Sequence, residues 1–85
     1  MRIIEVIADT GHSDTITSIA IQNEVLDIWS GAIDEDGRRA IRLLVRREKQ
    51  QALIDALQSV LGAAERAHIQ IEAVEGVWPR PPELA

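Results

Sequence analysis

The spacing of apolar residues along the chain changes from a period of two to a period of about 3.6 and back again, and it does so twice. A period of two is typical of a strand with one buried face, and a period of 3.6 is typical of a helix with one buried stripe. The pattern therefore predicts strand, helix, strand, strand, helix and strand in that order. The residues expected in these elements are 2–8, 13–23, 25–30, 39–45, 47–61 and 68–74.

This order of elements is the split β-α-β arrangement, and it predicts an α+β fold of the ferredoxin-like βαββαβ class. In that fold a four-stranded antiparallel sheet carries two helices on one face. Alternation in the last strand points Ile69, Ile71 and Ala73 toward the helices. The 85 residues are enough for one domain, which we expect to span residues 1–76. Residues 77–85 contain all three prolines and are expected to form an extended tail or linker.

The face of the sheet opposite the helices, called the open face below, is expected to mix large apolar side chains with charges that can pair. Alternation places ten residues there, namely Ile3, Glu5, Ile7, Asp27, Trp29, Arg42, Leu44, Gln70, Glu72 and Val74. A solvated sheet face normally shows a cleaner polar pattern, and a contiguous apolar patch marks an interaction surface. We therefore predict a homo-oligomer interface on the open face. Its expected residues are Ile3, Glu5, Ile7, Trp29, Arg42, Leu44, Glu72 and Val74.

Composition narrows the function classes. With 46% hydrophobic and 27% charged residues the chain is typical of a soluble globular protein, and its net charge of −5 argues against nucleic acid as a partner. The absence of cysteine excludes a thiolate nucleophile and a cysteine zinc site. The longest apolar runs are only a few residues, too short to span a bilayer, and the first strand lacks the form of a secretory signal. We expect a cytoplasmic location and no cofactor.

Two other functional sites are possible alternatives to the interface. Asp9, His12 and Asp14 put two carboxylates and an imidazole within six residues, which a metal ion could use. The competing interpretation is a solvated turn whose acids complement the helix dipole. The other alternative is a minor enzyme or binding module that uses the carboxylates of the open face, Glu5, Glu72 and Asp27, because paired carboxylates can do acid–base work. No nucleophile, cleft-forming insertion or Gly-rich loop accompanies them, so we expect no enzyme.

The remaining charged stretches are expected to be mostly solvated. Asp34, Glu35 and Asp36 lie in residues 31–37, which end in glycine and are expected to form a hairpin loop. Arg38 and Arg39 follow as the start of a basic stretch, and anion binding by these two is an alternative to ordinary ion pairing. Further along the same strand, Arg42 is expected beside Glu5 of the first strand.

The first and last predicted strands resemble those of PII-like proteins, which are ferredoxin-fold trimers whose sheets face inward. The resemblance is carried by residues 1–7 (MRIIEVI) and 69–75 (IQIEAVE). It implies a regulatory or assembly domain that forms homo-oligomers, trimers above all, and binds a small-molecule effector between subunits. Two departures from PII proteins stand out. Residues 31–37 are too short for the long effector-contacting loop, and residues 62–67 lack the Gly- and Lys-rich phosphate-contacting stretch. Nucleotide binding of the PII kind is therefore carried over to no residue.

More narrowly, residues 1–82 resemble the N-terminal cytosolic domain of a family of bacterial membrane proteins of unknown function. The segments that carry this resemblance are 2–7 (RIIEVI), 27–29 (DIW), 36–38 (DGR) and 74–81 (VEGVWPRP). In that family a hydrophobic multi-pass region follows the domain. The resemblance thus implies the cytosolic part of an inner-membrane protein, with membrane contact only through a C-terminal region outside these 85 residues.

Overall fold

A computed structural model describes residues 1–79 of the chain, which form four strands, two α-helices and two short 3-10 turns. In chain order these elements are β1 (Arg2–Asp9), η1 (Thr10–His12), α1 (Ser13–Gln22), β2 (Asp27–Ile33), β3 (Arg38–Val45), η2 (Arg47–Lys49), α2 (Gln50–Leu61) and β4 (His68–Ala73).

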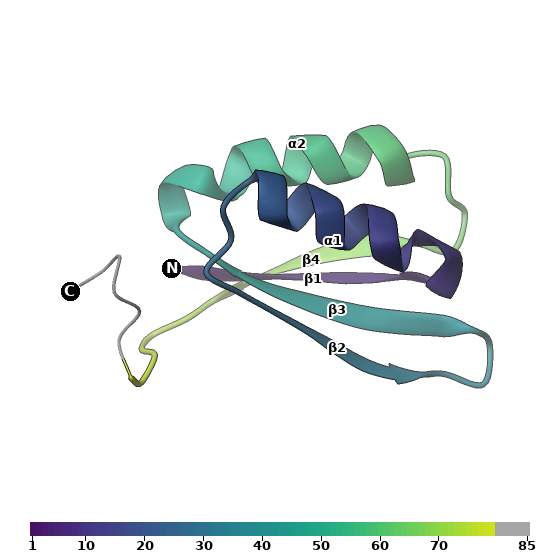
Figure 1. Ribbon diagram of the computed structural model, residues 1–85, viewed down its shortest axis with the longest axis horizontal. Helices are drawn as coiled ribbons and strands as arrows, with labels where there is room; N and C mark the ends of the chain where they lie inside the picture. The colour runs from purple at the N-terminus through teal and green to yellow at the C-terminus, as the bar shows by residue number, and fades with distance from the viewer. Residues whose placement is uncertain (80–85) are drawn as a thin grey trace.

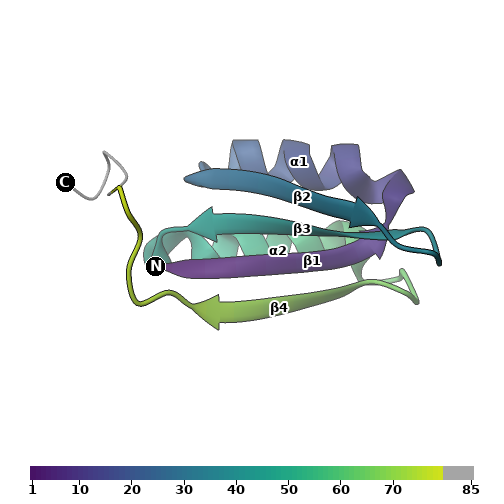
Figure 2. The same cartoon turned by 90° about the horizontal axis from the view of Figure 1, so that it is seen from below.

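The strands form one antiparallel sheet in the order β2-β3-β1-β4, and both helices lie on the same face of it (Figures 1 and 2). This confirms the predicted α+β, ferredoxin-like class. The two central strands, β1 and β3, pair in register from Arg2 opposite Val45 to Asp9 opposite Arg38. Within residues 1–79 no helix is long and apolar enough to cross a membrane.

The core lies between the sheet and the helices and is wholly aliphatic. Each central strand and each helix gives it three side chains: Ile4, Val6, Ala8, Ile16, Ile19, Ala20, Ile41, Leu43, Val45, Leu53, Leu57 and Leu61. Fully burying one such Leu, Ile or Val is worth about 1.5–3 kcal/mol. The helices are short, and α1 is rich in β-branched residues, so this burial rather than helix propensity holds them in place.

Two expectations about the sheet are wrong. Strand β2 starts at Asp27 and continues to Ile33 through residues expected to be loop, because Ile33 still pairs with Arg39 after a register shift. The turn itself is only residues 34–37, closed by a 3.0 Å bond from the Gly37 amide to the Asp34 carbonyl and by a positive φ of 82° at Gly37. Ile71, expected inside, is 49% exposed, since it lies on edge strand β4 where the helix layer leaves it uncovered.

The segment after β4 runs away from the sheet at the end of the molecule that also holds the N-terminus (Figure 1). The indole of Trp78 lies against Gly76 and is 84% exposed. Residues 80–85 of the expected tail lie outside the described residues. The division into a domain at 1–76 and a tail at 77–85 stays a prediction.

Candidate functional site

A row of four side chains crosses the open face from edge to edge. Trp29 on β2 is the cross-strand partner of Arg42 on β3, Arg42 of Glu5 on β1, and Glu5 of Gln70 on β4. Cross-strand partners have Cβ atoms about 4.5–5.5 Å apart, so the four can interact in sequence. The expected placement of Arg42 beside Glu5 is confirmed.

The Arg42 guanidinium makes most of the contacts within this row. Its Nη2 donates to Glu72 Oε2 at 2.5 Å, and its Nε lies 3.7 Å from Glu5 Oε2. The amide of Gln70 donates to the other oxygen of Glu5 at 2.8 Å. The guanidinium carbon lies 5.6 Å from the centroid of the Trp29 ring, within cation–π range. The charge of Arg42 is thus paired with two carboxylates on this face, which lowers the cost of desolvating it, although its Nε is buried without a hydrogen bond.

Next to this row the open face has a small apolar centre of its own. Leu44 points away from the helices yet is only 6% exposed. It is the partner of Ile3 on one side and of Asp27 on the other. Trp29, one strand away, remains 43% exposed. Leu44 is therefore shielded by its own chain, whereas much of the Trp29 side chain is open to solvent.

The register places seven of the predicted interface residues on this face, namely Ile3, Glu5, Ile7, Trp29, Arg42, Leu44 and Glu72. Val74 follows β4, with its amide bonded to the Met1 carbonyl at 3.3 Å. Their role in an interface stays a prediction.

The carboxylates of the open face do not converge. Glu5 and Glu72 share Arg42, but Asp27 lies on β2, the opposite edge strand from the β4 that carries Glu72. The Asp27 Oδ1 accepts a hydrogen bond from the Ile28 amide at 2.8 Å. The expectation that the three carboxylates converge for acid–base work is therefore wrong, because strands β3 and β1 lie between Asp27 and Glu72.

The Asp9, His12 and Asp14 turn does not form a metal site either. Asp9 Oδ1 lies 3.4 Å from Arg66 Nη1, in an ion pair with the loop before β4. In the part of the chain from 1 to 79, no group of three or more His, Asp or Glu side chains is placed to hold a metal ion. The structure thus favours the solvated, ion-paired turn over metal ligation.

Arg38 belongs to an ionic cluster, called the hairpin clamp below and formed by Asp9, Asp36, Arg38 and Arg66. Asp36 Oδ2 accepts from Arg38 Nε at 2.9 Å and lies 3.3 Å from Arg66 Nη2. Desolvation is the largest single influence on the pKa of Asp36 and raises it. Hydrogen bonds from the Arg38 amide and guanidinium, with the charges of Arg38 and Arg66, outweigh it and lower the pKa overall. Arg38 is thus already held by a carboxylate of its own chain, which argues against its use as an anion ligand.

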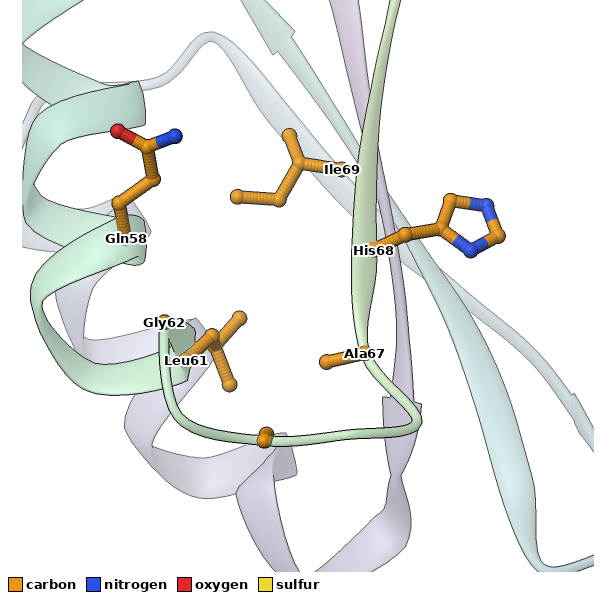
Figure 3. Close-up of a pocket in the computed structure, with 7 residues that line it drawn as sticks. Gln58, Leu61, Gly62, Ala67, His68 and Ile69 are labelled. Atoms are coloured by element: carbon orange, nitrogen blue, oxygen red, sulfur yellow. The ribbon is translucent and has the colours of Figure 1, made fainter.

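A pocket that was not predicted from the sequence lies between the C-terminal end of α2 and the start of β4, and is called the α2–β4 pocket. It has a volume of about 240 Å³, and its lining residues are Gln58, Leu61, Gly62, Ala64, Ala67, His68 and Ile69. Figure 3 shows Leu61, Ala67 and Ile69 reaching into the space, while the His68 ring points away from it. The run of small residues from Gly62 to Ala64 was the available signal, because small side chains leave room beside a helix end.

Comparisons with known proteins report on the fold. No protein-family model matches the chain, and no curated protein matches it. Among solved structures it is similar to CPII from Thiomonas intermedia K12, a nitrogen regulatory PII-like protein bound to ADP, AMP and bicarbonate. The TM-score is 0.74 at 16% identity, covering 84% of this chain and 83% of that one.

Two further structures support the same assignment. A DUF3240 family protein from Shewanella baltica OS155 matches with a TM-score of 0.72 at 17% identity, covering 89% of this chain and 91% of that one. A candidate PII-like signalling protein from Thermus thermophilus matches with a TM-score of 0.73 at 12% identity, covering 86% and 84%. At these identities the likeness concerns architecture alone. The chain has the ferredoxin-like fold found in PII-like proteins.

Proposed function

We propose that this protein is a PII-like regulatory and assembly domain that forms homo-oligomers through its open face and responds to a small-molecule effector. The observation that carries the proposal is the open face itself, with Leu44 shielded, Trp29 exposed and Arg42 neutralised within the subunit. The likeness to CPII and to the Thermus protein supports a signalling role rather than a catalytic one.

The size and chemistry of the open face suit association. The open face, seen in Figure 2, lies in the plane of the longest and the shortest dimensions of the molecule, 39 and 19 Å, so its area is comparable to the ~800 Å² per partner that a standard interface buries. Trp and Arg are enriched at the energetic centres of interfaces, and here Trp29 on edge strand β2 lies within cation–π distance of Arg42 on central strand β3. The trimer and the cytoplasmic location implied by the resemblance are part of this proposal. Attachment to a membrane region stays a prediction.

Light scattering coupled to size exclusion tests the assembly. The wild-type protein is expected to elute as an oligomer. Trp29→Asp is expected to shift it toward monomer, because the substitution replaces an exposed apolar side chain of the proposed interface by a charge that association would desolvate. Trp78→Asp is the matched control, since Trp78 is the other tryptophan and lies off the sheet. A wild-type monomer at high micromolar concentration would remove the proposed assembly.

For the effector, the α2–β4 pocket offers a lining of small and aliphatic residues with the amide of Gln58 at its side (Figure 3). Its volume of about 240 Å³ is below the usual ligand-pocket range of roughly 300–1,000 Å³, so we expect a second subunit to complete it. Calorimetry with ADP, AMP and bicarbonate, the ligands held by CPII, is the direct test. Ala67→Leu should abolish the heat by filling the space. Binding that survives Ala67→Leu unchanged would place the effector elsewhere.

A further inference from the structure

Arg46 and Arg47 are two of the four arginines in residues 1–79 that form no ion pair. Arg2 and Arg39 are the other two, whereas Arg38, Arg42 and Arg66 each pair with a carboxylate. The Nε of Arg46 is buried and makes no hydrogen bond, as is also true of the Nε of Arg39 and of Arg42, but Arg46 is the one of these three that lines a pocket described below. A buried donor without an acceptor is costly, and in native proteins it usually has a water or ion that completes it.

These two arginines line a separate pocket. It lies where β3 leads into α2, has a volume of about 120 Å³ and is lined by Met1, Arg46, Arg47 and Glu48. We call it the Arg46 pocket. Arg46 is held in an extended conformation (φ −69°, ψ 146°) before the η2 turn that begins at Arg47. In Figure 1 this junction lies at the end of α2 nearer the N-terminus, at the opposite end from the α2–β4 pocket.

From these observations we propose that the Arg46 pocket binds a small oxyanion, a phosphate or carboxylate group, through the guanidinium groups of Arg46 and Arg47. Guanidinium forks match such groups with short, charge-assisted hydrogen bonds. The pocket has room for about four water volumes of ~30 Å³ each, which fits one oxyanion group. A net charge of −5 repels anions from most of the surface, so an anion is held only where cations are concentrated.

Glu48 gives the proposal an internal test. Its carboxylate lines the same pocket and opposes an anion, so it weakens the affinity for one. Lys49 on the same turn does not line the pocket, and its Nζ is paired with Glu24 Oε1 at 3.3 Å. Substitutions at these two residues should therefore differ in effect. Glu48→Gln should raise the affinity for the anion, and Lys49→Gln should leave that affinity unchanged.

The experiment is an NMR titration of the full chain with sodium phosphate and with sodium acetate, with chloride balancing the ionic strength. We expect saturable amide shifts at residues 46–48, and an affinity about tenfold weaker in Arg46→Gln, the loss typical of one charge-assisted hydrogen bond. Arg46→Lys keeps the positive charge but lacks the planar guanidinium group, so its affinity should lie between those of the wild type and Arg46→Gln. Circular dichroism melts show whether each variant is folded.

Two results would overturn the proposal. One is the absence of saturable shifts up to roughly 20 mM phosphate, well above the millimolar Kd that such bonds give. The other is equal affinity in wild type and Arg46→Gln. Sedimentation with phosphatidylglycerol and phosphatidylcholine vesicles separates the sources of the oxyanion. Arg46-dependent binding to phosphatidylglycerol alone assigns the site to a lipid headgroup, and phosphate binding without vesicle binding assigns it to a free anion.

Discussion

Ile41 and Ile71 both point to the helix side of the sheet by alternation, but their surroundings differ. Ile41 on central strand β3 is 1% exposed, whereas Ile71 on edge strand β4 is 49% exposed. A period of two tells which way a side chain points. It does not tell how far the opposing helix reaches, because that depends on strand order and helix position. The sequence therefore predicted the core of the central strands correctly and failed at the edge.

The same pair of residues gives a stability prediction. Ile41→Ala is expected to lower the free energy of unfolding by about 2–5 kcal/mol, since it removes buried methyl groups and leaves a cavity. Ile71→Ala should cost less than about 1 kcal/mol, because roughly half of that side chain is already in water. Urea unfolding of both variants measures the difference. Equal losses would mean that β4 is covered in solution, as it would be in an oligomer that buries this edge.

Between elements, the contacts that could not be predicted from the sequence are those that join distant loops. Arg66 lies in the α2–β4 loop and Asp36 in the β2–β3 turn, yet the Arg66 guanidinium donates to the Asp36 carbonyl oxygen at 2.5 Å. Nothing in the local pattern of either segment points to the other, since each is typical of a solvated turn. The Glu5–Arg42 pair was found because strand order fixes which residues face each other.

The hairpin clamp should make stability depend on pH in the acid range. The pKa of Asp36 in the folded protein is lowered from its ordinary value of 3.8. Its contribution is therefore present in full above that ordinary value and is lost as the pH falls through the lower folded-state pKa. In urea unfolding, the stability difference between wild type and Asp36→Asn should be constant near neutral pH and shrink below about 3.8. A difference that grows on acidification would contradict the sign of this shift.

At the scale of the whole molecule, association through the open face would make thermal stability depend on protein concentration. If subunits associate through it, association stabilises the native state by mass action, and Tm must rise with protein concentration. A concentration about a hundredfold above Kd adds about 2.7 kcal/mol, which for a domain of this size moves Tm by on the order of 10 °C. The wild type and Trp78→Asp should both show this rise. Trp29→Asp should melt at one lower temperature throughout, because it cannot bury the centre that Leu44 and Trp29 form. A wild-type Tm that does not change over a hundredfold range of concentration would mean that the face stays in water, and Leu44 would then be shielded only by its own chain.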